Sequence, residues 1–126
     1  GSTSLVTEKS IYYRTGTPIA SNTVNLRAGT GIGIDQPVQV RLSGSGRVID
    51  AYTATGNINI KEVDDDLYVG NITSDNGNVR LEAQTKIVGV DGNSLIKGKL
   101  IELFTAYGSI GSDTLPLKVD SGEGAG

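Results

Sequence analysis

The sequence predicts an all-β chain, and two observations support that prediction. Few stretches of about ten residues are free of Gly, β-branched residues, Asn and Asp, and none of these has the apolar spacing of an amphipathic helix. Short triplets recur instead, usually with a polar residue between two apolar ones, which is the period-two pattern of a strand with one buried face. These triplets are Val24–Leu26, Val40–Leu42, Ile58–Ile60, Leu67–Val69, Val79–Leu81, Ile101–Leu103 and Leu117–Val119. Clusters of Gly, Asn, Ser and Asp separate them and predict turns.

The spacing of the triplets predicts a repeat of about 20 residues. All of them except Leu67–Val69 contribute to this series, whose first members are Val24, Val40, Ile58, Val79, Ile101 and Leu117. The steps between these positions are unequal, and the first and last steps are the shortest. A strand with tight turns in each repeat is typical of a parallel β-helix, a form of β-solenoid. In a solenoid of about six coils, the first residues of these triplets would stack into one inward ladder and the third residues into its neighbour.

A second arrangement of the same strands remains open. Short strands separated by turns are equally typical of an antiparallel β-sandwich, and the unequal steps count against a regular solenoid. A solenoid fragment would also expose strand edges at both ends. If the chain is such a fragment, we therefore expect marginal stability or edge-to-edge self-association.

One repeat region is predicted over residues 3–120. Gly1 and Ser2 are typical of the residues left after tag removal, and the Gly-rich segment 121–126 predicts a flexible tail. The irregular coil length leaves room for a protruding loop around residues 62–66.

Composition excludes several classes of chemistry. The 126 residues include 18 Gly but no Cys and no His. A disulfide framework, a thiol nucleophile, the usual zinc ligand sets and a histidine base are therefore excluded, and we predict no enzyme, no cofactor and no metal. A carbohydrate-active enzyme stays a weak alternative, because Glu82 and Glu102 would lie at equivalent outward places in neighbouring coils.

Charge and hydropathy indicate whether the chain binds nucleic acid or crosses a membrane. The chain has 11 Lys and Arg against 14 Asp and Glu, a net charge of −3, and its basic residues are scattered singly. A nucleic-acid binder needs a basic stripe, so no nucleic-acid partner is expected. No apolar run approaches the roughly 20 residues that span a bilayer, so the chain is not expected to be transmembrane.

Two clusters are the candidate partner contacts. Tyr12, Tyr13 and Arg14 combine residue types that are common in binding hot spots. Asp64, Asp65 and Asp66 form the only dense acidic run. Carboxylates at 64 and 66 suit a hard cation such as Ca²⁺, but a solvated turn that binds local backbone N–H groups is the favoured interpretation.

Three stretches resemble the repeats of one group of very large bacterial exoproteins. Residues Leu100–Asp120, with Gly108-Ser109-Ile110-Gly111 followed by Pro116-Leu117, resemble the coils of filamentous-haemagglutinin-like adhesins and the related fusobacterial leukotoxin. The stretch Gly77–Asn93 resembles the preceding coil, and Val24–Val40 is a weaker copy.

This resemblance implies a right-handed parallel β-helix and so favours the solenoid over the sandwich. It also implies a non-catalytic module of a secreted or surface-displayed adhesin or toxin, a rigid rod whose loops meet a host-cell receptor or glycan. The other partners would be neighbouring coils of a parent chain. The alternatives are a carbohydrate-active or glycan-binding β-helix and a receptor-binding β-sandwich domain.

Overall fold

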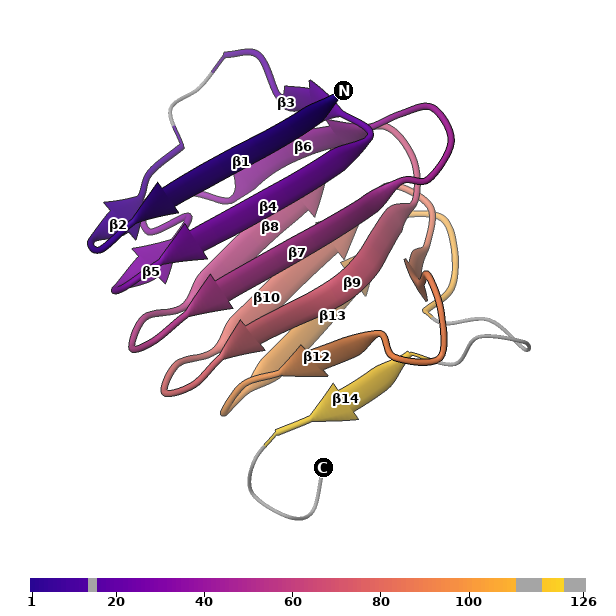
Figure 1. Ribbon diagram of the computed structural model, residues 1–126. Coiled ribbons are helices and arrows are strands. Elements are labelled where there is room, and N and C mark those ends of the chain that lie inside the picture. Colours follow the sequence, from indigo (N-terminus) through magenta and orange to yellow (C-terminus); the bar gives the residue numbers. More distant parts are fainter. Residues whose placement is uncertain (14–15, 111–116, 122–126) are drawn as a thin grey trace.

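Parallel strands stacked in two sheets form the body of the protein (Figure 1). The structure is a computed structural model that describes residues 1–13, 16–110 and 117–121. These residues form a β-solenoid of about five turns and contain no helix. Every strand pair within them is parallel. The all-β and parallel-solenoid predictions are therefore confirmed, and the antiparallel sandwich is wrong; the right-handed sense stays a prediction.

The two sheets alternate along the chain. The front sheet has the order β1 (Ser2–Thr7), β4 (Thr23–Ala28), β7 (Val48–Thr53), β9 (Leu67–Ser74), β12 (Leu95–Lys97) and β14 (Lys118–Asp120), with β11 (Ile87–Gly89) also beside β9. The rear sheet has the order β13 (Ile101–Thr105), β10 (Val79–Ala83), β8 (Ile58–Glu62), β5 (Gly31–Ile32) and β2 (Ser10–Ile11). In the rear sheet β6 (Val38–Leu42) also pairs with β8, and β3 (Ile19–Ser21) pairs with β6.

The predicted inward ladder is right for its central and later members. Ile58, Val79 and Ile101 are in register on β8, β10 and β13. Their neighbours at the third triplet position, Ile60, Leu81 and Leu103, are in register on the same strands. Polar residues alternate with them and face outward, as the period-two pattern predicts.

The earlier and last members of that ladder were assigned wrongly. Val24 lies on β4 of the front sheet between Thr3 and Ile49, whereas Val40 lies on β6 of the rear sheet beside Glu62. Leu117 directly precedes β14, again in the front sheet. Each coil contributes a strand to both sheets, so the short step from Val24 to Val40 crosses from one sheet to the other within a coil. The count is consequently about five turns, not six.

The true coil-to-coil repeat is clearest in the front sheet. One inward ladder runs through the whole stack and takes one residue from each front strand of the main path. Its members are Leu5, Leu26, Ala51, Ile72, Ile96 and Val119. Aliphatic side chains fill the space between the two sheets, because branched residues without aromatic rings fit a narrow interior.

Tight glycine turns join the front strands to the rear strands. A Cβ atom on Gly56 would overlap the carbonyl oxygen of Thr30 in the preceding coil, and one on Gly77 would overlap that of Gly56. The asparagines that follow these two glycines also bind each other. The backbone N–H of Asn78 donates to Oδ1 of Asn57 at 2.8 Å. These contacts hold successive turns directly against one another.

Gly1 and Ser2 contact the strand of the following coil. The amino group of Gly1 donates to Oδ1 of Asn22 at 2.7 Å, and Ser2 is paired with Thr23. Gly1 and Ser2 are thus part of the stack, and their origin from a tag stays a prediction. No helix among the described residues is long and apolar enough to cross a membrane, and residues 122–126 of the predicted tail lie outside them.

Candidate functional site

The tyrosine cluster predicted as a partner contact is split by the fold. Tyr12 follows β2 and is 59% exposed, so its ring is open to a partner. Tyr13 instead packs against the hydrophobic core, and its hydroxyl donates to the carbonyl of Gly16 at 3.3 Å. Arg14 lies outside the described residues. Of the two described members, Tyr12 is the one positioned for contact.

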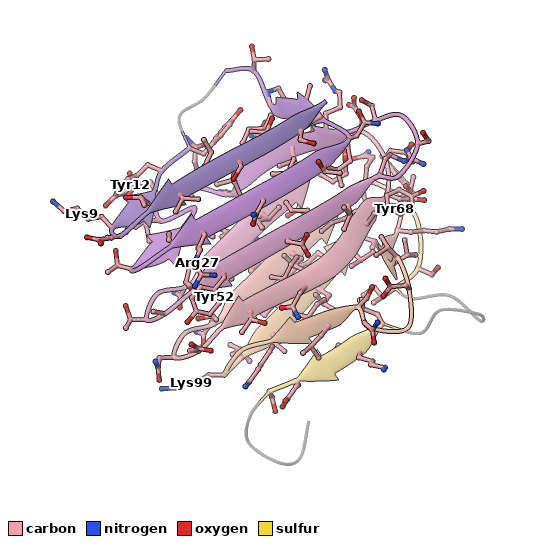
Figure 2. The ribbon with its side chains drawn as sticks, viewed as in Figure 1. Lys9, Tyr12, Arg27, Tyr52, Tyr68 and Lys99 are labelled. Carbon is pink, nitrogen blue, oxygen red and sulfur yellow. The ribbon has the colours of Figure 1, made fainter. Side chains whose placement is uncertain are left out.

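The acidic run lies elsewhere, at the turn from the rear sheet to the front sheet. Figure 2 shows Tyr12 and Tyr68 at opposite edges of the solenoid, and Tyr68 is hydrogen-bonded to Asp66. The structure therefore does not bring the two predicted contact clusters together. We call the turn that contains Asp64, Asp65 and Asp66 the acidic corner.

The carboxylates of the acidic corner bind side chains of neighbouring coils and the nearby Tyr68. Asp64 forms an ion pair with Arg41, and Asp65 forms one with Arg47 at 3.3 Å. Asp66 accepts hydrogen bonds from the hydroxyl groups of Tyr68, at 3.2 Å, and Thr85. All three carboxylates thus have protein partners.

Arg47 and Tyr68 complete this network. The guanidinium carbon lies 4.3 Å from the ring centroid, and Nη2 donates to the Tyr68 hydroxyl at 2.8 Å. Burial raises the pKa of Tyr68, the charge of Asp66 raises it further, and the charge of Arg47 opposes both. The phenol therefore stays protonated at neutral pH and donates to Asp66. The described residues contain no group of three or more acidic side chains arranged to hold a metal ion.

Glu62 does not lie in the protruding loop that was predicted around residues 62–66. It is the last residue of β8, and its side chain has no exposed surface. One carboxylate oxygen accepts the backbone N–H of Leu42 at 2.7 Å, and the other accepts those of Asp64 at 2.7 Å and Asp65 at 3.2 Å. The inward alternation of Ile58 and Ile60 continues to position 62, and this signal was present in the sequence.

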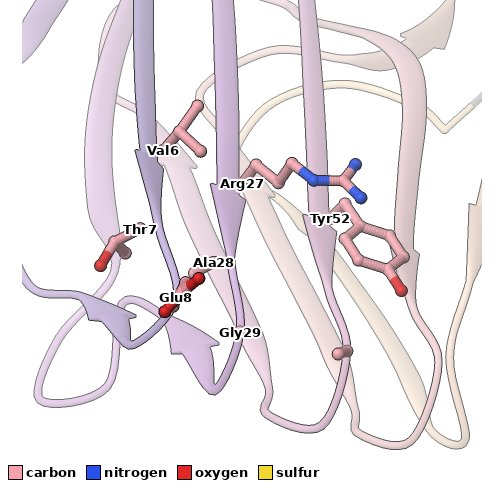
Figure 3. A pocket seen from close by; sticks show the side chains of 8 residues that line it. Val6, Thr7, Glu8, Arg27, Ala28, Gly29 and Tyr52 are labelled. Carbon is pink, nitrogen blue, oxygen red and sulfur yellow. The ribbon is translucent and has the colours of Figure 1, made fainter.

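A groove on the opposite edge is a further candidate site. It has a volume of about 580 Å³ and lies where β1, β4 and β7 end (Figure 3). Val6, Arg27 and Tyr52 are in register there and face outward. We call it the front groove; the residues that line it are Val6, Thr7, Glu8, Arg27, Ala28, Gly29, Tyr52 and Ala54.

The groove combines a cation, an aromatic ring and apolar surface. The Arg27 guanidinium carbon lies 4.5 Å from the centroid of the Tyr52 ring, and the Tyr52 hydroxyl donates to Asp75. That hydrogen bond raises the pKa of Tyr52, with smaller contributions from burial and from the Asp75 charge. Val6 is 69% exposed beside them.

The charged groups of the front groove are available to a ligand. Within the described part of the chain, neither Arg27 nor Glu8 has an ion-pair partner. Because Tyr52 holds the guanidinium by its face, the N–H groups of Arg27 remain free to donate to a carboxylate or hydroxyl group. The groove therefore offers a cation, a carboxylate, an aromatic ring and apolar surface in one place.

The sequence prediction missed this groove. It assigned no role to Val6, Glu8 or Arg27. The alternation of apolar and polar residues shows which positions on a strand face outward. It does not show which outward residues of two strands lie side by side, and the register between β4 and β7 places Arg27 beside Tyr52. The shorter steps taken from the triplets hid that register.

The two carboxylates considered for a carbohydrate-active enzyme are not at equivalent places. Glu82 is in register with Phe104, and Glu102 is in register with Arg80. Both are on the outer side of the rear sheet, but they are two positions apart along it. Glu82 also pairs with Lys61 at 3.2 Å, which gives it a structural partner.

Comparison with known proteins gives no relative. No protein-family model matches the chain, and neither a curated protein nor a solved structure matches it.

Proposed function

We propose that this chain is a non-catalytic β-solenoid module of a large secreted or surface-displayed bacterial adhesin or toxin. In this role the stacked coils supply a stiff rod, and outward side chains meet a receptor or glycan on a host cell. The parallel solenoid is the observation that carries the proposal. The resemblance of Leu100–Asp120 to adhesin and leukotoxin coils supports the bacterial and extracellular assignment.

The coil-to-coil contacts support a mechanical role. Glycine turns, backbone ladders and the acidic corner each connect a coil to the one before it. Each coil contacts mainly its neighbours, so the arrangement extends by adding further coils of a parent chain. Such a rod would hold a binding surface at a fixed distance from its anchor.

The front groove is the surface we assign to host contact. Its exposed Val6 side chain suits the apolar face of a sugar ring or a small receptor side chain. The free guanidinium of Arg27 suits a carboxylate or hydroxyl group of the same ligand. Glycan binding is accordingly the second candidate function, and it uses the same groove.

Attachment to cells tests this proposal. Beads coated with the chain should adhere to cultured epithelial cells more than beads coated with an unrelated protein. The double variant R27A/Y52A should lose most of that adherence. The matched control is R80A/F104A, because Arg80 and Phe104 also form a cation–ring pair, at 4.5 Å, on the rear sheet.

The outcomes separate the parts of the proposal. Wild-type beads that adhere no better than the unrelated protein overturn the host-contact role. Equal loss in both double variants overturns the assignment of the front groove. Loss of cell viability on exposure to the soluble chain would favour a toxin over an adhesin, and circular dichroism of each variant checks that it is folded.

A further inference from the structure

A second hollow lies on the outer side of the front sheet, where β7 begins. Its volume is about 540 Å³, and it shares no lining residue with the front groove, which lies where the same strand ends. Its walls come from β7, from β9 and from the turn between β11 and β12, all in the interior of the stack. We call it the bulge pocket; the residues that line it are Gly46, Arg47, Val48, Asp50, Gly70, Asn71, Val90, Asp91 and Asn93.

A β-bulge forms one wall of this pocket. The register of β7 against β9 shifts by one residue between Ile49 and Ala51. As a result, Gly70 and Asn71 of β9 together lie opposite Asp50 of β7. A Cβ atom on Gly70 would overlap Oδ1 of Asp50, so the glycine leaves room for this carboxylate. Bulges redirect the side chains beside them and are common next to functional sites.

The bulge holds the Asp50 carboxylate in place. The backbone N–H of Asn71 donates to Oδ1 of Asp50 at 2.8 Å, and the side chain is half-buried. Within the described part of the chain, Oδ2 of Asp50 has no hydrogen-bond partner and the carboxylate has no ion-pair partner. A carboxylate anchored by one oxygen presents the other as a fixed acceptor, which lowers the entropy cost of binding a ligand.

The turn between β11 and β12 supplies the same kinds of group. Oδ1 of Asp91 accepts the backbone N–H of Asn93 at 2.7 Å, and among the described residues Asp91 forms no ion pair. The side chains of Asn71 and Asn93 add amide donors. Oδ1 of Asn71 accepts the hydroxyl of Thr73 at 2.6 Å, which leaves its NH₂ group to donate.

The cations at this pocket are already engaged. Arg47 pairs with Asp65 and lies over the ring of Tyr68, and Lys118 donates to the carbonyl of Gly92 at 2.6 Å. The two anchored carboxylates therefore disfavour an acidic ligand. An ammonium group only donates hydrogen bonds, so it would leave the amide donors unpaired. A hydroxyl group both donates and accepts, and so it matches both kinds of group.

We propose that the bulge pocket binds a neutral sugar unit through adjacent hydroxyl groups. The hydroxyl groups donate to the carboxylates of Asp50 and Asp91 and accept from the amide of Asn71. Val48 and Val90 are half-buried in the wall and provide apolar surface for the C–H groups of the ring. This inference does not rest on the role of the front groove, which presents a free guanidinium instead.

Titration followed by ¹⁵N–¹H correlation NMR tests the proposal. The probes are the methyl glycosides of mannose, galactose, glucose and fucose. At least one of them should cause saturable shifts of the backbone amide signals of Asn71 and Asn93, because these N–H groups donate to the carboxylates that hold the sugar. Methyl glucuronide, which carries a carboxylate, should bind at least tenfold more weakly. Butylamine, which offers only an ammonium group, should cause no saturable shift there.

Two variants identify the groups that bind. D50N/D91N keeps the shape of both side chains but loses two anchored carboxylates, and it should bind the best glycoside at least tenfold more weakly. N93A should also bind more weakly. Its side chain has no hydrogen bond within the described residues, so this variant decides the question if D50N/D91N fails to fold. The matched control is R27A/Y52A, which alters the front groove alone and should bind as wild type does.

Three outcomes would overturn the proposal. They are the absence of saturable shifts at Asn71 and Asn93 with all four glycosides, wild-type affinity in the folded variants, and equal or tighter binding of methyl glucuronide or butylamine. The control also separates this inference from host-cell contact. R27A/Y52A should lose adherence to cells and keep sugar binding in the bulge pocket, so either proposal can fail while the other stands.

Discussion

The carboxylate of Glu62 accepts the backbone N–H of Leu42 at 2.7 Å across the boundary between two coils. This pair lies where the ladder of β6 and β8 ends, and the side chain replaces the carbonyl group that another strand residue would have supplied. A buried charge is stable in such a place only when hydrogen bonds replace its water. Glu62 obtains three of them, from Leu42, Asp64 and Asp65.

Removing this carboxylate should destabilise the protein. We expect Glu62→Ala to lower the free energy of unfolding by about 2 to 3 kcal/mol, because buried donors lose their acceptor. Glu62→Gln should cost less, since it keeps the shape and one acceptor oxygen. Urea denaturation followed by circular dichroism measures both. Glu102→Ala, at an exposed outward position, should stay within about 0.5 kcal/mol of wild type; an equal loss there would contradict the role of Glu62.

The close stacking of the glycine turns leads to a second prediction. Gly56→Ala should lower the free energy of unfolding by about 3 kcal/mol, because its Cβ would overlap a backbone carbonyl that cannot move without shifting the preceding coil. Gly92→Ala is the control, since no atom lies within 4 Å of the position of its Cβ. Thermal unfolding should separate the two variants by several degrees. Similar melting temperatures would show that the turns are not stacked this closely.

The residue pattern was sufficient to predict the strands, and the resemblance to adhesin coils favoured their parallel stacking, but neither showed how the strands are divided between two sheets. The alternation at Ile58–Ile60, Val79–Leu81 and Ile101–Leu103 gave correct ladders, because each step between these triplets is one whole coil. The alternation at Val24 and Val40 was equally clear, yet a period-two pattern does not show which sheet a strand joins.

The candidate site was predicted less well for a related reason. Tyr12 and the acidic run were noticed because their residues are adjacent in the sequence. The front groove is built from residues that are each a whole coil apart, Val6, Arg27 and Tyr52, which become neighbours only through the register of three strands. Glu62 was assigned to a loop because the irregular coil length was given more weight than the alternation that places its side chain inward.

The raised pKa of Tyr68 predicts a loss of stability in alkaline solution. A phenol whose pKa is higher in the folded state than the ordinary value of 10.0 holds its proton more tightly when folded. Its stabilising contribution is complete below the ordinary pKa and is lost as the pH rises through the folded-state pKa. Urea denaturation across this range should show a steeper loss for wild type than for Tyr68→Phe. Tyr107→Phe, at an 81% exposed position, should retain the wild-type slope.

Calcium should leave the stability unchanged. Binding it at the acidic corner would require Asp64, Asp65 and Asp66 to give up Arg41, Arg47, Tyr68 and Thr85. The ion would have to replace these contacts as well as its own water. Melting curves with calcium and with a chelator should therefore coincide. A saturable rise in melting temperature that disappears in Asp64→Asn/Asp66→Asn would show that the corner does bind the ion.

Two leucines of one ladder provide the sharpest test of the core. Leu81 and Leu103 are directly in register on β10 and β13, but Leu81 is fully buried between two coils whereas Leu103 is only partly buried at the end of the stack. Leu81→Ala should lower the free energy of unfolding by about 3 to 4 kcal/mol, the range for a leucine cavity that cannot collapse. Leu103→Ala removes the same atoms from a site open on one side, so its cost should be about half as large or less. Urea denaturation measures both. Equal losses would contradict the difference in burial between the two leucines.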